Sequence, residues 1–211
     1  MTIKLAVLST LCYHDLFDYP LTQSEISKFL IGNSQLKIQN LIKKKQVQKK
    51  NGFYFLAGRG EIVKIRRRRQ KTSQKKLASA RRISRWLRRL PTIKLIAATG
   101  AVAIGNAKEN DDLDFLIITA ANRLWLTRFF VLLLTEILGK RRRPNDINVR
   151  DKACLNVLLD ENHLTLPPSK RNLFTAHEIC QMQVLNQKDN FHQRFLDANQ
   201  WLVKFLPNWK K

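Results

Sequence analysis

The spacing of apolar side chains predicts three helices in the first part of the chain. Apolar residues recur every three or four positions over 3–17, 23–30 and 35–45, as they do on one face of a helix. Thr22 is followed three residues later by Glu25, a capping box that marks the start of the second helix. The first helix is expected to bury Leu5, Leu8, Cys12 and Leu16.

A hairpin follows the third helix. Residues 46–48 and 53–56 are strand-like runs on either side of Asn51-Gly52, a dipeptide that favours a two-residue hairpin turn. Three helices followed by a basic hairpin resemble a winged helix-turn-helix, and we expect residues 1–58 to form such a domain. Its nucleic-acid contacts would come from Lys37, Asn40, Lys43, Lys44, Lys49 and Lys50. The alternative is a winged helix that docks a protein or has only a structural role.

We expect residues 59–90 to form a basic helical linker of one or two helices. Arginines recur at three- and four-residue spacing toward its end. Between them stand apolar residues that predict a buried side on the same helix, namely Ile83, Trp86, Leu87 and Leu90. An unbroken arginine run earlier in the linker is expected to contact nucleic-acid phosphates, through Arg66, Arg67, Arg68 and Arg69.

The middle of the chain alternates between strands and a helix. Apolar runs at 95–98, 115–118 and 154–159 predict three strands, which we expect to form a sheet. Residues 123–139 predict a helix packed on that sheet. This helix is expected to bury Trp125, Phe129 and Leu133.

The end of the chain is predicted to be helical. Pro167 and Pro168 close the sheet region, and two helices are expected over 172–185 and 190–205. The predicted division of the second half is therefore a core over 91–165 and C-terminal helices over 166–211.

Two carboxylates, Asp112 and Asp114, stand at the start of the strand predicted over 115–118. Side chains alternate along a strand, so both carboxylates point to the same face. Like charges held that close repel each other and lose water on partial burial. A divalent cation relieves both costs, and oxygen ligands of this kind suit Mg²⁺, which nucleotide enzymes bind through one or two carboxylates and substrate phosphates.

This stretch resembles the signature of the polymerase-beta nucleotidyltransferase superfamily. The signature joins an apolar strand, Gly-Gly or Gly-Ser, a short spacer and Asp-x-Asp on the next strand. Here Gly100-Ala101 is followed, after ten residues, by Asp112-Leu113-Asp114. The resemblance implies that the two aspartates hold Mg²⁺ or Mn²⁺ and are catalytic, and that Gly100 and Ala101 bind a nucleoside triphosphate. Ala101 stands where the family usually has Ser or Gly.

The superfamily usually supplies a third carboxylate from the following strand, as base for the attacking hydroxyl and as a metal ligand. Within 154–159 the polar residue is Asn156, whose amide cannot act as a base. Asp151 and Asp160 bracket this strand, and either is an alternative source of the third carboxylate.

The charge of the chain is strongly positive and unevenly distributed. Its 211 residues carry 39 Lys and Arg against 16 Asp and Glu, a formal net charge of +23. Residues 61–90 hold thirteen of the basic residues and one acidic residue, so +12 falls within thirty positions. A basic stripe of that density predicts a polyanion partner, DNA or RNA, with a solvated basic helix as the alternative.

The remaining composition favours a cytoplasmic protein. The three cysteines, Cys12, Cys154 and Cys180, show no CxxC spacing, which favours a reducing compartment and no zinc site. No signal peptide is predicted. The longest apolar stretch, 124–138, contains Arg128 and Glu136 and is too short to cross a bilayer, so no membrane partner is expected.

Together these features predict an α+β protein with a winged helix-turn-helix domain and C-terminal helices. Between them, the resemblance implies a minimal nucleotidyltransferase fold, a small mixed sheet with helices. The first functional hypothesis is a Mg²⁺-dependent enzyme that moves a nucleoside monophosphate from a nucleoside triphosphate to a hydroxyl, on a nucleic acid or another acceptor. The second is a catalytically weak or inactive protein of the same fold that binds DNA or RNA as a regulator. The third and least favoured is a peripheral membrane or ribosome-associated protein that uses its charge alone.

Overall fold

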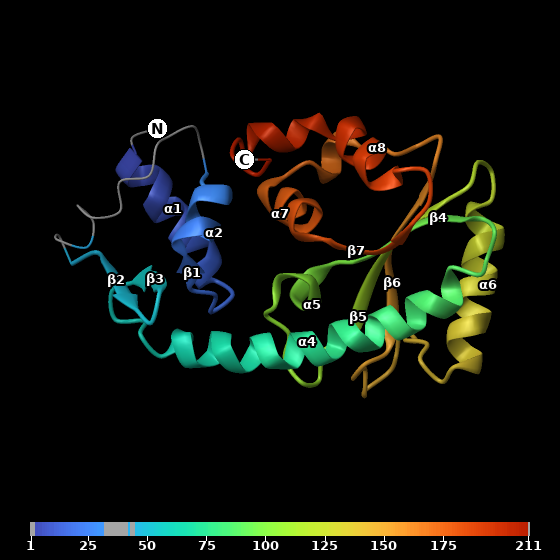
Figure 1. Cartoon of the computed structure of the whole chain (residues 1–211), viewed down its shortest axis with the longest axis horizontal. Helices are drawn as coiled ribbons and strands as arrows, with labels where there is room; N and C mark the ends of the chain where they lie inside the picture. The colour runs from blue at the N-terminus through green and yellow to red at the C-terminus, as the bar shows by residue number, and fades with distance from the viewer. Residues whose placement is uncertain (1–2, 32–41, 43–44, 211) are drawn as a thin grey trace. The chain divides into compact units, whose positions relative to one another are not determined.

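The computed structural model describes residues 3–31, 42 and 45–210 (Figure 1). The chain divides into two units. The first comprises residues 1–68, 171–180 and 201–211, and the second comprises residues 69–170 and 181–200. Residues near the C-terminus therefore contribute to both units. Within the described part of the chain, none of the helices has the length and hydropathy needed to cross a membrane.

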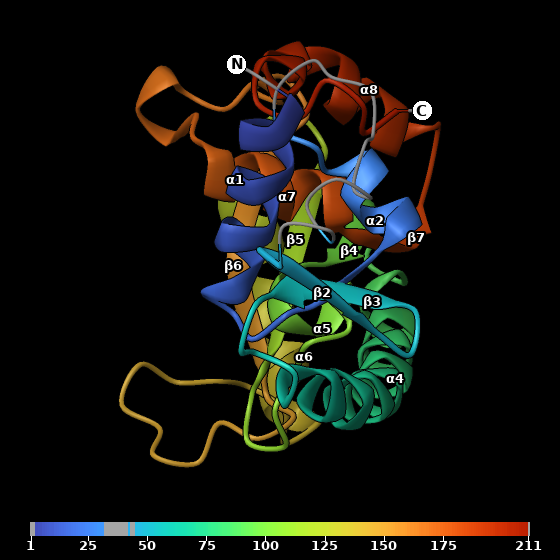
Figure 2. The ribbon, with the colours of Figure 1, turned by 90° about the vertical axis from the view of Figure 1, so that its left-hand side faces the viewer.

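The first unit contains a small antiparallel sheet and short helices. Its elements begin with α1 (Ile3–Asp15), β1 (Leu21–Thr22), α2 (Gln23–Lys28), β2 (Val47–Lys50) and β3 (Phe53–Leu56). The strands pair in the order β1-β3-β2, and β2 and β3 form the predicted hairpin (Figure 2). Asn51 and Gly52 at its turn have φ values of 52° and 85°, as the primed hairpin turns require.

The capping box at the start of α2 is also confirmed. Glu25 N donates to Thr22 Oγ1 at 3.2 Å, and Thr22 N donates to Glu25 Oε2 at 2.8 Å. Both bonds satisfy backbone donors that the first turn of a helix leaves without an intrahelical partner.

The third helix, predicted over 35–45, falls almost entirely outside the described residues. The same is true of four of its predicted contact residues, Lys37, Asn40, Lys43 and Lys44. Lys49 and Lys50 lie on β2 and are exposed. The winged helix-turn-helix therefore stays a prediction, because the helix that would define it is not described.

Helix α1 buries a different face from the predicted one. Leu5 and Leu16, expected inside, are 52% and 78% exposed. Thr10 lies on the buried face, where its hydroxyl donates to Ala6 O at 2.8 Å and accepts from Ile31 N at 3.0 Å. A threonine satisfied in this way is buried at little cost, so the apolar pattern alone gives the wrong face. The buried residues are Ala6, Val7, Thr10, Leu11 and His14.

Helix α4 (Ile62–Leu87) is a single basic helix of 26 residues. The four consecutive arginines near its start lie in two different environments. Arg67 and Arg68 are exposed, whereas Arg66 and Arg69 are 6% and 9% exposed. Arg66 Nη2 donates to Glu25 Oε1 at 2.7 Å, so this arginine stabilises the first unit. Half of the predicted phosphate-binding run is therefore buried within the protein.

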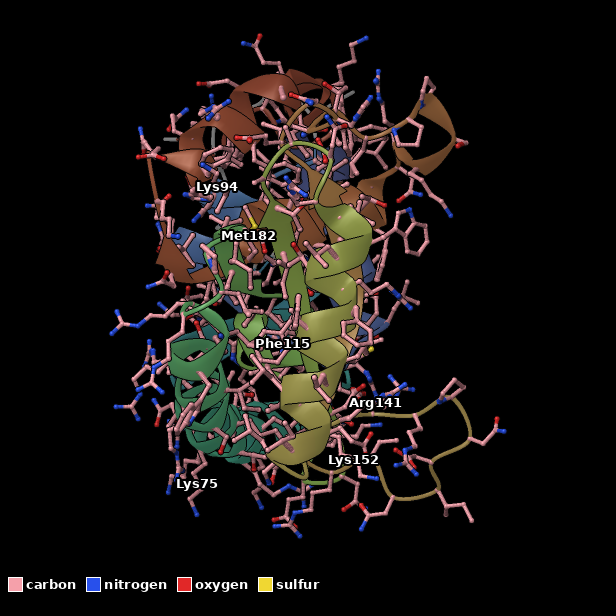
Figure 3. All side chains as sticks on the ribbon, turned by 90° about the vertical axis from the view of Figure 1, so that its right-hand side faces the viewer. Lys75, Lys94, Phe115, Arg141, Lys152 and Met182 are labelled. Carbon is pink, nitrogen blue, oxygen red and sulfur yellow. The ribbon has the colours of Figure 1, made fainter. Side chains whose placement is uncertain are left out.

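The second unit is built on a mixed sheet with strand order β6-β5-β4-β7. Strand β4 (Ile93–Ala98) pairs antiparallel with β5 (Leu113–Thr119) and with β7 (Gln183–Gln187). Strand β5 also pairs parallel with β6 (Ala153–Asp160). The small mixed sheet is thus confirmed. Phe115 lies in its core together with residues of α4, as Figure 3 shows near the middle of the unit.

The sequence pattern does not predict strand β7. The helix expected over 172–185 is α7 (Leu173–Gln181), which ends before β7 begins. The C-terminal segment is therefore not purely helical, although α8 (Phe191–Ala198) and the 3-10 helices η1 (Pro168–Lys170) and η2 (Gln200–Lys204) flank the strand. Strand β7 is held by backbone hydrogen bonds to the edge of β4, a strand far from it in the sequence. Local apolar spacing carries no signal for such a pairing.

Helix α6 (Leu124–Ile137) packs through a face that the sequence pattern does not predict. Trp125, Phe129 and Leu133, expected in the core, are 77%, 61% and 45% exposed. The threonine hydroxyls on the opposite face are hydrogen-bonded within the protein, which lowers the cost of their burial. The residues that α6 buries are Thr127, Val131 and Thr135.

Trp86 on α4 is also more exposed than predicted, at 46%. The inward positions of this part of the helix are Ile83 and Leu87, which are buried as expected. The guanidinium of Arg89 lies 4.3 Å from the centroid of the Trp86 ring, a cation–π contact. Trp86 therefore belongs to the arginine side of α4.

Two buried histidines lie side by side in the first unit. His14 on α1 and His177 on α7 have ring centroids 5.0 Å apart, and His177 stacks on Tyr13 at 4.4 Å. Burial lowers the pKa of His14 to about 4 and that of His177 to about 3. The positive charge of Arg66 adds to the shift of His14. Both rings are therefore neutral in the folded protein at neutral pH.

We predict that this pair makes the protein sensitive to acid. Below the ordinary histidine pKa of 6.5 the unfolded chain binds protons on both rings, while the folded protein does not until its lower pKa values are reached. The free energy of unfolding therefore has its full value above pH 6.5 and falls as the pH drops, by about 2 kcal/mol per histidine at about pH 5. Urea unfolding at neutral pH and at about pH 5 measures the loss.

The variant His177→Phe should remove about half of this loss, because one of the two titrating rings is gone. His163→Gln is the matched control, since His163 is exposed, and it should leave the loss unchanged. If His177→Phe lost as much stability between neutral pH and about pH 5 as the parent protein, His177 would not be a source of the acid sensitivity.

Candidate metal and nucleotide site

The segment that follows β4 is hydrogen-bonded to the start of β5. Helix α5 (Gly100–Ile104) begins two residues after β4 ends, and Asp114 is the second residue of β5. Thr99 N donates to Asp114 O at 3.0 Å. The glycine and the aspartate of the predicted signature are therefore neighbours in space.

Gly100 occupies a position that strongly favours glycine. Its φ is +63°, in the region that side-chain-bearing residues rarely adopt. A Cβ built on Gly100 would lie 2.5 Å from Asp114 Oδ2, so the carboxylate fills the space that a side chain would need. Ala101 follows in the first turn of α5 and is partly exposed.

Asp112 and Asp114 are both partly buried, at the place where β5 begins. Burial, with the negative charge of Asp112 as the next cause, raises the pKa of Asp114 to about 6. A shift in this direction is expected where two carboxylates share a small volume with little water. The cluster therefore favours the binding of a proton or a cation.

Cys154 completes this cluster. It lies on β6 directly beside Asp114 in the parallel register. One ligand atom from each of Asp112, Asp114 and Cys154 lies within 4.8 Å of the other two. Burial, followed by the charges of the two carboxylates, raises the pKa of the Cys154 thiol. We call these three residues the DDC cluster.

Arg142 supplies the positive charge of the DDC cluster. It follows α6 in the basic run 140–143, and Figure 3 shows the neighbouring Arg141 where the helix gives way to a loop. Arg142 Nη1 donates to Asp112 Oδ2 and lies 3.4 Å from Cys154 Sγ. One guanidinium thus contacts both an oxygen and the sulfur of the cluster.

The residue of β6 that lies beside Asp114 is Cys154 and not Asn156. The β5–β6 ladder has an irregularity after Phe115, where its partner changes from Leu155 to Val157 for the next pair. Asn156 is the residue that this irregularity leaves without a register partner, and it is exposed. Counting along the strand could not reveal this shift, because it depends on how the two strands pair.

The two alternative aspartates are used elsewhere. Asp151 accepts a hydrogen bond from Lys76 Nζ at 2.8 Å, and Asp160 accepts one from Asn122 N at 2.7 Å. They stabilise loops at the two ends of β6, and neither belongs to the DDC cluster.

Buried polar residues of α4 hold the loop that leads into Asp112. Arg69 Nη1 donates to Asn106 Oδ1 at 3.2 Å. Ser73 Oγ accepts from Ala107 N at 2.8 Å, and Lys76 Nζ donates to Asp111 O at 2.7 Å. The spacing of four and then three residues places them on one side of the helix, a signal present in the sequence but hidden among basic residues. These residues are Arg69, Ser73 and Lys76.

No protein-family model and no curated protein matches the chain. Similar solved structures include the crystal structure of a toxin-antitoxin with AMP-PNP, at 16% identity over 56% of this chain and 82% of that chain, with a TM-score of 0.35. Two mutants of the toxin-antitoxin MntA-HpeT match at 15% identity over 56% of this chain. They are covered over 81% and 80% of their own lengths, with TM-scores of 0.35 and 0.34. Superpositions this loose do not assign the fold.

We predict that Gly100→Ala displaces the Asp114 carboxylate, because the new Cβ takes its place. The pKa of Asp114, followed by NMR of its carboxyl carbon, should fall from about 6 toward its ordinary value as the group moves into water. Gly105→Ala is the matched control, since Gly105 has a φ of +79° but a Cβ added there would meet nothing within 4 Å. Both variants should lose about 1 kcal/mol of stability through backbone strain. An unchanged pKa in Gly100→Ala would contradict the contact.

Proposed function

We propose that the chain is a divalent-metal-dependent nucleotidyltransferase. It would move a nucleoside monophosphate from a nucleoside triphosphate to a hydroxyl and release pyrophosphate. The observation that carries this proposal is the fit of Gly100 against the Asp114 carboxylate. The two halves of the sequence signature meet there, with a glycine beside a pair of partly buried carboxylates.

The donor set of the cluster suits a divalent cation. Asp112 and Asp114 offer the hard oxygen ligands that Mg²⁺ and Mn²⁺ prefer. The raised pKa of Asp114 reflects the cost of placing a second negative charge in this volume, which a cation offsets. When bound, such an ion would be held by Asp112 and Asp114 and would neutralise the charge that builds up on the phosphates.

The residues of the chain would act mainly by positioning. Gly100 and Ala101 carry little or no side chain, so a triphosphate can approach the backbone at the start of α5. The loop that leads into Asp112 is fixed to α4 by the hydrogen bonds of Ser73 and Lys76. Fixed geometry matters because phosphoryl transfer depends largely on alignment and charge stabilisation. Among the described residues, the third ligand atom grouped with Asp112 and Asp114 is a thiol, so the DDC cluster itself offers no third carboxylate as a base for the attacking hydroxyl.

We predict that labelled nucleotide is transferred from a triphosphate to cellular RNA or protein in the presence of Mg²⁺ or Mn²⁺. Asp112→Asn and Asp114→Asn should each lower the transfer by on the order of 100-fold, because each removes charge stabilisation at the reacting phosphate. Glu109→Gln is the control, as Glu109 is an exposed acid in the loop before Asp112. Transfer that persists in both aspartate variants would show that the cluster does not carry the activity.

A second candidate is a nucleic-acid-binding regulator of weak or no catalytic activity. The exposed arginines of α4 and the exposed ring of Trp86 favour this candidate. Basic side chains bind phosphates, and an accessible aromatic ring can stack on an unpaired base. A winged helix-turn-helix over residues 1–58 would add to this surface. Ala101 and Cys154 depart from the catalytic signature and point the same way.

We predict that RNA binding depends on Arg67 and Arg68 of α4. Arg67→Gln combined with Arg68→Gln should reduce the slope of the logarithm of the RNA-binding constant against the logarithm of the salt concentration by roughly 1.5, since two phosphate contacts are lost. Arg150→Gln combined with Lys170→Gln removes the same charge from exposed positions outside α4 and should leave the slope nearly unchanged. Equal effects of the two pairs would indicate attraction by net charge alone. The same measurement on Asp112→Asn shows whether binding and the metal cluster are independent.

A further inference from the structure

Cys154 gives the DDC cluster a ligand that Mg²⁺ does not favour. The register between β5 and β6 places Cys154 beside Asp114, and its sulfur and one oxygen of each aspartate lie within 4.8 Å of one another. A tetrahedral ion holds its ligand atoms roughly 3–4 Å apart, which follows from bond lengths of about 2.0–2.3 Å.

Sulfur and oxygen select different ions. Thiolates favour Zn²⁺ and similar soft or borderline ions, whereas Mg²⁺ keeps to oxygen ligands. Two carboxylates and one thiolate make three protein ligands, a set that leaves a fourth position of a tetrahedral ion open. The other two cysteines, Cys12 and Cys180, belong to the first unit and not to this cluster.

Arg142 contacts the same atoms that such an ion would bind. Its Nη1 donates to Asp112 Oδ2 and lies 3.4 Å from Cys154 Sγ. The side chain is 39% exposed, so the guanidinium can move into solvent without disturbing the core. Arg142 and a metal ion are therefore alternative counter-charges for the cluster.

We propose that Cys154 is a metal ligand and that the DDC cluster binds a thiophilic divalent ion such as Zn²⁺, in exchange for the guanidinium of Arg142. On binding, the thiol releases its proton to solvent and its sulfur bonds to the ion, with no change of oxidation state. This inference rests on the metal assignment of the proposed function and not on nucleotidyl transfer. Zn²⁺ held there would take the place of Mg²⁺, so it should inhibit any Mg²⁺-supported reaction.

Co²⁺ tests the proposal, because Co²⁺ bound to a thiolate has a near-ultraviolet charge-transfer band that Co²⁺ bound to oxygen lacks. Titration of the full chain with Co²⁺ should produce this band, and added Zn²⁺ should abolish it. Cys154→Ser should remove the band. Cys154→Asp should also remove it while Mn²⁺ binding is kept, and it provides a second variant if Cys154→Ser does not fold by circular dichroism.

The matched control is the double variant Cys12→Ser and Cys180→Ser, which leaves Cys154 as the remaining cysteine of the chain. It should keep the full band. Arg142→Gln should keep the band and tighten Co²⁺ binding several-fold, because a competing cation is removed. Weaker Co²⁺ binding in Arg142→Gln would overturn the proposed exchange.

The outcomes separate this inference from the proposed function. A band that survives in Cys154→Ser, or Co²⁺ that binds the parent protein with no band, overturns Cys154 as a ligand and leaves the carboxylate site intact. A Cys154-dependent band without nucleotidyl transfer overturns the proposed enzyme and supports the metal ligand. Failure of the full chain to bind Co²⁺ or Mn²⁺ overturns both.

Discussion

The close contact between the Asp114 carboxylate and the backbone of Gly100 is the constraint on which the second unit depends. A side chain at residue 100 would need the volume that Asp114 Oδ2 fills, and the positive φ of Gly100 turns the chain from β4 into α5 beside it. The bond from Thr99 N to Asp114 O ties the same two segments together. This arrangement brings a carboxylate into a partly buried position, and the hydrogen bond of Cys154 and the charge of Arg142 offset part of the cost of that burial.

The positive side chains of the chain fall into two classes, those paired with carboxylates inside the protein and those exposed to solvent. Arg142 pairs with Asp112, and the almost fully buried Lys76 pairs with Asp151 while it holds the loop before Asp112. Arg66 has a similar internal role in the first unit. Lys76 and Arg66 are the buried members of their pairs, and the fold needs their acidic partners, since a buried charge without a partner is strongly destabilising. Only the exposed remainder of the +23 charge is available to a polyanion.

Local signals in the sequence predicted local structure. The capping box at Thr22, the Asn51-Gly52 turn and the apolar runs of β4, β5 and β6 need only neighbouring residues, and the structure confirms them. Features that depend on assembly were missed. The exposed aromatic face of α6, the strand β7 and the burial of Arg69 follow from which surfaces meet in three dimensions. The pair Asp112 and Asp114 was predictable because both lie in one short motif, whereas Cys154 joins them through strand register alone.

A thiol beside Asp114, where a carboxylate could also stand, has opposite consequences for the two proposed properties of the site, catalysis and metal binding. A third carboxylate beside Asp114 would supply a base for the attacking hydroxyl, but it would add a third negative charge to a volume in which burial and Asp112 already raise the pKa of Asp114. A thiol at this position is neutral until an ion draws off its proton, so the cluster tolerates burial with Arg142 as its counter-charge. The absence of a CxxC pattern argues only against a zinc site built from one segment of the chain. The site proposed for the DDC cluster would be assembled from β5 and β6. In the proposed site, the same residue would thus weaken general-base catalysis and give the cluster its affinity for softer ions.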